Sequence, residues 1–148
     1  MKARPFINIF LPLWLLLSLW QACFTQLIPD EAYYWLYAQN PAWGYFDHPP
    51  MIALMIKAGT MLFANELGVR FFVVLFSTGT LWLMYKIVEP ENEWLFIGII
   101  SSIVPLHLLV NFAVPDVPLL FFAALFFFAL KGYLQSEGKA STHLLFCR

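Results

Sequence analysis

The feature that most constrains this chain is its set of long apolar runs. Residues 6–28 contain no charged side chain, and a helix needs about 20 such residues to cross a lipid bilayer. Residues 68–88, 94–114 and 118–133 form three further apolar segments. Hydrophobic residues make up 61% of the chain and charged residues 11%, whereas soluble domains have roughly 45–50% and 25%. The sequence therefore predicts an all-α, polytopic membrane protein with four transmembrane helices.

The distribution of basic residues predicts the orientation of these spans. With the N-terminus in the cytoplasm, six of the eight Lys and Arg residues lie inside and only Lys57 and Arg70 lie outside, as the positive-inside rule favours. A cleaved signal peptide is the alternative for residues 6–28, but the run is too long and no small-residue cleavage site follows it. We expect a bacterial inner (plasma) membrane protein whose outer loop, residues 29–67, is periplasmic or extracellular. The scattered basic residues and the net charge of -1 give no reason to expect a nucleic-acid partner.

Residues 29–50 within this outer loop carry most of the side chains that could do chemistry. This stretch holds three of the nine acidic residues together with seven aromatic rings and four prolines. The following apolar run, residues 49–63, is short for a span, and we expect it to lie at the membrane surface as a helix. The rings also have a structural explanation, because aromatic side chains collect at membrane interfaces.

Asp30 and Glu31 directly follow the first predicted span. Asp30 could cap a short helix over residues 32–39, because Asp is a favoured N-cap residue. Alternatively, the two carboxylates could supply a general base at the lipid surface. The spacing alone leaves both readings open.

Asp47 and His48 precede two prolines, which suit the first turn of a helix. Either residue could cap that helix, or the two together could bind a divalent metal ion or a phosphate. Two adjacent ligands form only part of a metal site.

Two other polar residues are predicted on the same outer face. Asp116 lies in the turn before the fourth span, where Asp is also common for structural reasons. Arg70 lies near the outer end of the second span, where it could reach the membrane surface or bind a lipid phosphate.

The motifs DEAYYW, GYFDHPP, ELGVR and PDVPLLFF occur in this order, and the chain resembles the polyprenyl-phosphate-sugar-dependent membrane glycosyltransferases of the GT-C fold. It is most similar to the protein O-mannosyltransferase-like group (glycosyltransferase family 39) and to lipid A aminoarabinose transferase-like proteins. The resemblance extends from the first span to about Tyr133. It implies that residues 1–134 are the N-terminal transmembrane part of a glycosyltransferase domain and that residues 135–148 are a cytoplasmic tail.

The resemblance implies an activity and a role for each candidate residue. Such enzymes transfer a sugar, with inversion, from a polyprenyl-phosphate donor to an acceptor hydroxyl on a protein, lipid or glycan outside the membrane. The implied catalytic residues are Asp30, with Glu31 beside it, and Asp116. Arg70 and His48 are implied to bind the donor phosphate, and Asp47 a divalent metal ion.

The chain is shorter than members of this family, so we expect a fragment or a truncated product. Two alternatives to an enzyme follow: a non-catalytic remnant or interaction protein, and a small four-span transporter. A transporter is expected to carry ionisable residues near the bilayer midplane, whereas the charges here gather at one face.

Overall fold

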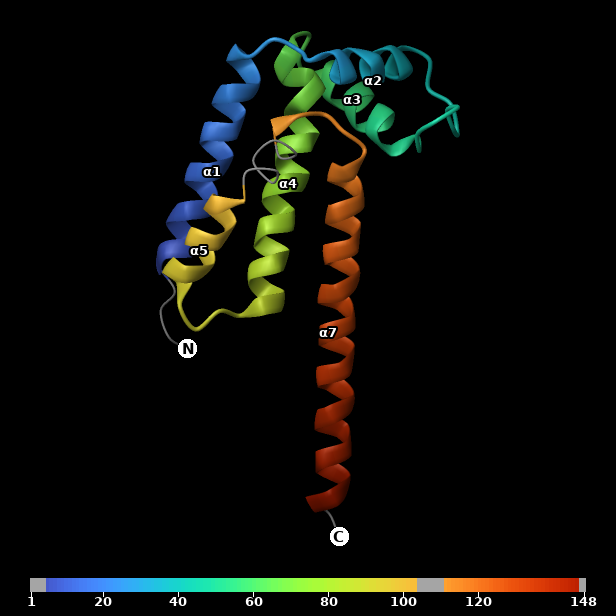
Figure 1. Cartoon of the computed structure of the whole chain (residues 1–148). Coiled ribbons are helices and arrows are strands. Elements are labelled where there is room, and N and C mark those ends of the chain that lie inside the picture. Colours follow the sequence, from blue (N-terminus) through green and yellow to red (C-terminus); the bar gives the residue numbers. More distant parts are fainter. Residues whose placement is uncertain (1–4, 104–110, 147–148) are drawn as a thin grey trace.

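The computed structural model describes residues 5–103 and 111–146, and every regular element in these residues is an α-helix. Its helices are α1 (Pro5–Phe24), α2 (Pro29–Gln39), α3 (Met51–Leu62), α4 (Glu66–Val88), α5 (Glu93–Ser102) and α7 (Asp116–Phe146). The long helices α1, α4 and α7 run side by side, and α2 and α3 lie across their ends (Figure 1).

Three of the described helices are long and apolar enough to cross a membrane: Phe6–Phe24, Glu66–Val88 and Asp116–Ser136. They confirm the predicted first, second and fourth spans. Many of their large apolar side chains are exposed, as expected for helices that face lipid; Leu16 and Phe126 are both 63% exposed. This arrangement supports an integral membrane protein.

The predicted third span is corrected by helix α5. The prediction placed one continuous helix over residues 94–114, but α5 ends at Ser102 and Ile103 leaves the helical conformation, with ψ at 88°. Ten helical residues rise only about 15 Å, so α5 alone does not cross a bilayer. Residues 104–110 of the predicted span lie outside the described residues.

No helix ends at residue 134, the predicted boundary between the transmembrane part and the tail. Helix α7 continues from Asp116 to Phe146 and extends well past the end of α4 (Figure 1). Hydrophobicity identifies only the apolar part of this helix, since the polar residues that follow Tyr133 are also compatible with helix.

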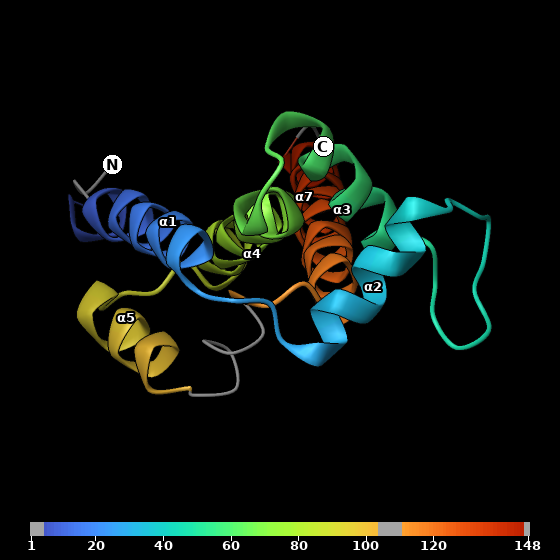
Figure 2. The same ribbon diagram turned by 90° about the horizontal axis from the view of Figure 1, so that it is seen from above.

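The surface helices α2 and α3 agree with the prediction for the outer loop. Seen from above, they lie next to each other on one side of α4 and α7, away from α1 (Figure 2). Two prolines precede α3 and one begins α2, as their missing N–H groups allow at a helix start. Both helices therefore lie at the end of the bundle where α1 ends and α4 begins.

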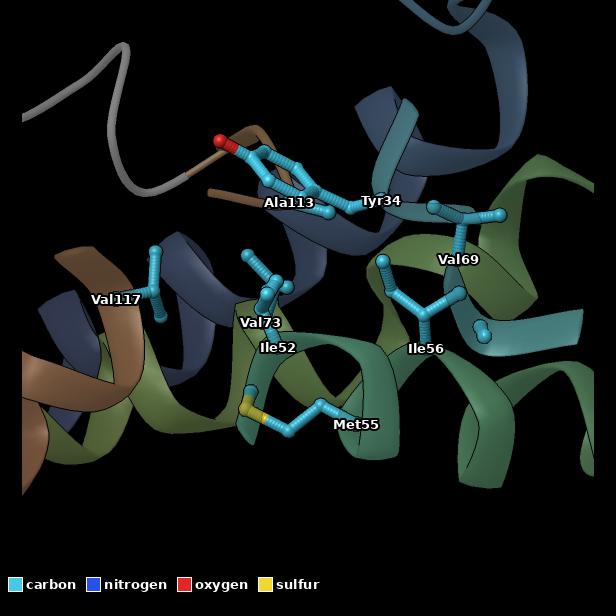
Figure 3. Packing of buried hydrophobic residues seen from close by; sticks show 9 residues of the cluster. Tyr34, Ile52, Met55, Ile56, Val69, Val73, Ala113 and Val117 are labelled. Atoms are coloured by element: carbon cyan, nitrogen blue, oxygen red, sulfur yellow. The ribbon is translucent and has the colours of Figure 1, made fainter. Parts of the chain in front are cut away.

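Two apolar clusters hold the helices together at opposite ends. The cluster below α2 and α3 includes Tyr34, Ile52, Ile56 and Val73 (Figure 3). At the other end, Ile7 and Leu81 pack with Tyr85, Phe96 and Ile100 of α4 and α5. The first cluster fixes the position of α2 above α4.

Helices α3 and α4 approach each other closely at two glycines. A Cβ atom on Gly59 would lie 2.0 Å from the carbonyl oxygen of Gly68, and a Cβ on Gly68 would lie 2.0 Å from that of Phe63. Both opposing atoms belong to the backbone, so neither can move aside by a side-chain rotation. The turn between α3 and α4 therefore requires glycine at both positions.

We predict that Gly59→Ala lowers the free energy of unfolding by about 1–3 kcal/mol, because it overpacks this contact. Gly98→Ala is the matched control in α5, since nothing lies within 4 Å of a Cβ at that position; it should stabilise the protein by about 0.5–1 kcal/mol through helix propensity. Thermal unfolding in detergent measures both. Equal effects of the two substitutions would contradict the close approach.

Candidate active site

A buried ion pair lies between α2 and α4, at the end of the bundle where α4 begins. Glu31 and Arg70 are both fully buried, and the Arg70 guanidinium donates to both carboxylate oxygens of Glu31, at 2.7 Å from Nε and 2.5 Å from Nη2. Helix geometry explains why Glu31 points inward: it shares one face of α2 with the buried residues Tyr34 and Ala38.

Arg70 uses its remaining donors on the segment that follows α1. Nη1 donates to the carbonyl oxygen of Thr25 at 2.8 Å and to its hydroxyl at 2.5 Å, and Nη2 donates to the carbonyl oxygen of Gln26 at 2.8 Å. A guanidinium has five N–H groups. Each of them is therefore accounted for by Glu31, Thr25 or Gln26.

The Glu31 carboxylate also accepts hydrogen bonds from two backbone N–H groups. Its Oε2 accepts the N–H of Ile28 at 3.1 Å, and its Oε1 accepts the N–H of Ala113 at 2.9 Å. Each oxygen thus accepts two hydrogen bonds. One carboxylate joins the end of α1, the start of α2, the start of α4 and the segment that leads into α7.

These contacts argue against two of the roles expected for Glu31 and Arg70. A carboxylate with both oxygens engaged and no exposed surface is not placed to accept a proton from a substrate, and Arg70 has no donor left for a phosphate. The geometry favours a positioning role for the pair.

The structure excludes one of the two readings left open for Asp30, the helix cap. The N-cap of α2 is Ile28 and its first residue is Pro29, so Asp30 does not cap the helix. It is exposed, and it accepts no hydrogen bond from the described part of the chain. One peptide bond therefore separates a fully engaged carboxylate, Glu31, from one that is available to a substrate.

Asp30 shares its surroundings with the other two predicted carboxylates. Burial raises the pKa of the Tyr34 phenol, and the negative charges of Asp30, Asp47 and Asp116 each raise it further. The contacts of Tyr34 bring the neighbours of these residues together: its hydroxyl lies 3.1 Å from His48, next to Asp47, and its ring packs in one cluster with Val117, next to Asp116.

Asp47 belongs to a cluster of tyrosines on α2. Its Oδ1 accepts a 2.8 Å hydrogen bond from the Tyr37 hydroxyl, and its Oδ2 accepts a 3.1 Å bond from Tyr33. The Tyr33 and Tyr37 hydroxyls also bond to each other, and Tyr45 stacks on Tyr37. The Tyr37 bond is the main cause of the lowered pKa of Asp47, and the Tyr33 bond and the nearby His48 lower it further, against an opposing contribution from burial.

His48 connects this cluster to Tyr34. Its Nε2 lies 3.1 Å from the Tyr34 hydroxyl and 3.5 Å from Oδ2 of Asp47. The N-cap of α3 is Pro50, without a side-chain hydrogen bond, so neither Asp47 nor His48 caps that helix.

The expected metal ion at Asp47 stays a prediction. Within residues 5–103 and 111–146, no group of three His, Cys, Asp or Glu side chains could hold a metal ion. Asp47 and His48 provide two ligands, and Asp47 is engaged by two hydroxyls. These residues do not form a complete site for a resident metal.

Sequence reasoning missed the partners of the predicted residues. The sequence does not indicate that Thr25 and Gln26 bind Arg70, because every residue has a backbone carbonyl. The tyrosines were attributed to the membrane interface, whereas Tyr33, Tyr34 and Tyr37 bond to Asp47 and His48. Their spacing of three and four residues along α2, which places them on one face, was the signal that could have identified them.

Comparisons with known proteins agree with the resemblance seen in the sequence. Residues 47–147 match the family model described as dolichyl-phosphate-mannose-protein mannosyltransferase. The chain is also similar to the lipid A galacturonosyltransferase RgtD of Rhizobium johnstonii, with 32% identity over 120 residues, which cover 77% of this chain and 25% of that protein. The matched region thus spans about a quarter of the length of this relative. No solved structure matches the chain significantly.

We predict that Glu31→Gln lowers the free energy of unfolding by about 3–5 kcal/mol, because it leaves the Arg70 charge buried without its counter-ion. Chemical unfolding in detergent measures the loss. Glu89→Gln is the control, because the Glu89 side chain is 57% exposed in its ion pair with Lys131 and such surface pairs contribute about 0–1 kcal/mol. A similar loss in both variants would rule out a special role for the buried pair.

We also predict that Tyr37→Phe raises the pKa of Asp47 toward its ordinary value of 3.8, because it removes the hydrogen bond that lowers that pKa most. With its pKa lowered, Asp47 stabilises the fold above about pH 3.8, and this contribution is lost as the pH falls through the lowered pKa. NMR titration of the carboxyl carbons measures the change. Tyr45→Phe should leave the Asp47 pKa in place, since the Tyr45 hydroxyl bonds to backbone atoms of Tyr37, Asn40 and Ala42.

Proposed function

The chain belongs to the dolichyl-phosphate-mannose-protein mannosyltransferase family of glycosyltransferases, and we propose that it forms part of the active site of a membrane enzyme that uses a polyprenyl-phosphate-linked sugar. The enzyme transfers this sugar to an acceptor hydroxyl of a protein, lipid or glycan at the outer face of the membrane. Asp30 is the general base of this reaction.

The observation that carries this proposal is the packing of Tyr34, whose hydroxyl lies 3.1 Å from His48 and whose ring belongs to the cluster with Val117; these contacts set Asp47 and Asp116 beside the helix of Asp30, at one end of the membrane-spanning helices. A polyprenyl-phosphate donor keeps its lipid chain in the bilayer and its sugar at the surface. A group of carboxylates just outside the spans lies where that sugar would be presented.

Asp30 is assigned as the base because it combines exposure with an uncommitted carboxylate. An acceptor hydroxyl is a weak nucleophile and needs a base within hydrogen-bond reach. Asp30 takes the hydroxyl proton as the acceptor oxygen forms its bond to the anomeric carbon. The bond from that carbon to the phosphate oxygen breaks at the same time, and its electron pair leaves with the phosphate. Attack from the face opposite the phosphate inverts the anomeric configuration.

Asp116 is assigned to the stabilisation of the transition state. The anomeric carbon gains positive charge as the phosphate leaves, and a nearby carboxylate lowers the energy of that charge, as in glycosidases. Asp116 is exposed at the first residue of α7, where it faces the same region as Asp30. Its position on a different helix allows the two carboxylates to act from separate directions.

His48 is assigned to the donor phosphate, with Tyr34 as its positioning partner. The phosphate leaving group needs positive charge or hydrogen-bond donors rather than a general acid. A protonated His48 supplies both, and its contact with Tyr34 fixes the ring. Oδ2 of Asp47 lies 3.5 Å from the ring nitrogen Nε2.

Arg70 and Glu31 enter the proposal as positioning residues. Their ion pair fixes the start of α2 against α4 and the segment before α7, and so sets the distance between Asp30 and Asp116. We orient the chain with this end outside and the end that carries Lys86 and Lys131 in the cytoplasm, following the positive-inside rule.

We predict that Asp30→Asn lowers the rate of sugar transfer by about 10²–10⁴-fold, because the amide cannot accept the hydroxyl proton. The assay follows transfer from a polyprenyl-phosphate donor in membranes that contain the intact enzyme. Unfolding of this variant should match the wild type, because Asp30 makes no hydrogen bond within the described chain.

Glu91→Gln is the matched control for this substitution. Glu91 is an exposed carboxylate at the opposite end of the bundle, so its loss should leave transfer unchanged. Transfer near the wild-type rate in Asp30→Asn would refute the base assignment; a complete loss in Asp116→Asn together with full activity in Asp30→Asn would move the base to α7.

A further inference from the structure

A pocket lies at the same end of the bundle as the candidate active site, on another side of α2. Its volume is about 500 Å³, and it lies between α2, the last turns of α3 and the start of α4. The polar or aromatic side chains that line it are Trp35, Gln39, Lys57, Thr60, Asn65 and Glu66.

The helical repeat of α2 separates this pocket from the candidate active site. Trp35 and Gln39 are four residues apart and share one side of the helix. Asp30 and Tyr37 point about 140–180° away from them at 3.6 residues per turn. A ligand in the pocket therefore does not occupy the place of the sugar.

Two opposite charges line the pocket without neutralising each other. Lys57 is half-buried and Glu66 is exposed. Among the described residues, the ion pairs are those of Arg70, His48 and Lys131, so neither Lys57 nor Glu66 is paired within that part of the chain. Unpaired charges of both signs at one pocket match a ligand that itself carries both signs.

The position of the pocket, level with the ends of two membrane-spanning helices, indicates that its ligand is a lipid headgroup. Leu27 follows the end of one membrane span and Glu66 begins another, and both line the pocket. This is the level at which spanning helices leave the hydrocarbon, and Trp is enriched there.

The rim of the pocket is apolar. Met61, which lines the pocket, is 78% exposed, and its neighbour Leu62 is 61% exposed. An acyl chain lying across these two residues would continue directly from a headgroup in the pocket. The apolar rim distinguishes a bound lipid from a soluble zwitterion.

We propose that this pocket binds the headgroup of a zwitterionic phospholipid that carries a primary ammonium, such as phosphatidylethanolamine. The Lys57 ammonium contacts the phosphate, and the Glu66 carboxylate accepts hydrogen bonds from the lipid ammonium. The lipid fastens α2 and α3 to the outer leaflet, beside the candidate active site. This site is independent of the proposed transfer reaction.

Native mass spectrometry of the intact protein from detergent tests the proposal, with phosphatidylethanolamine, phosphatidylcholine and phosphatidylglycerol in competition. The wild type should retain phosphatidylethanolamine in preference to the other two. Lys57→Gln should reduce that retention about fivefold, as expected for one cation at a membrane surface, and Lys57→Arg should keep it. Glu66→Gln should shift the preference toward phosphatidylglycerol, because it removes the repulsion of an anionic headgroup.

Lys86→Gln is the control at the opposite end of α4 and should leave the lipid preference unchanged. Wild-type retention without a preference for phosphatidylethanolamine would overturn the proposal. So would Lys57 and Glu66 variants that behave like the wild type, or a Lys86 variant with the same loss as Lys57→Gln. If phosphoethanolamine, which has no acyl chains, displaced the bound lipid, the pocket would be a site for a soluble ligand, and the lipid proposal would be overturned.

Discussion

The buried ion pair between Glu31 and Arg70 determines the arrangement of the end of the bundle where α2 and α4 begin. Removing two charges from water costs several kcal/mol per ion, so such a pair persists only when nearly every donor and acceptor is satisfied. Arg70 and Glu31 meet this condition with hydrogen bonds to Thr25, Gln26, Ile28 and Ala113. Three segments that are distant in sequence are thereby held at one point: residues 25–31, the start of α4 and the segment before α7.

In this arrangement two adjacent residues have different roles: Glu31 is structural, and Asp30 is the candidate base. Neighbouring residues of a helix point about 100° apart, so Asp30 does not share the inward direction of Glu31 and lies exposed. A loop would not hold that direction, whereas the first turn of α2, anchored by the ion pair, does. The candidate base is thus oriented by its neighbour, and the tyrosines of α2 orient Asp47 and His48 in the same way.

Much of the fold could be predicted from hydrophobicity, because membrane spans depend on length and composition alone. The spans α1, α4 and the first part of α7, the surface helices and the location of Asp30, Asp47 and Asp116 at one end followed from it. The pairing of Glu31 with Arg70 did not, since 39 residues separate them and any of several carboxylates could have been the partner. The end of α5 at Ser102 was also missed, because the apolar sequence after it would equally suit a helix.

Carboxylate labelling gives the most direct test of this account. The intact protein is treated with a carbodiimide and an amine, and tandem mass spectrometry assigns the modification to Asp30 or to Glu31 within one peptide. Asp30, which is exposed, should be labelled readily, and Glu31, which has no exposed surface, should remain unmodified until the protein unfolds. Equal labelling of the two residues in the folded protein would contradict both the buried ion pair and the assignment of Asp30 as the available base.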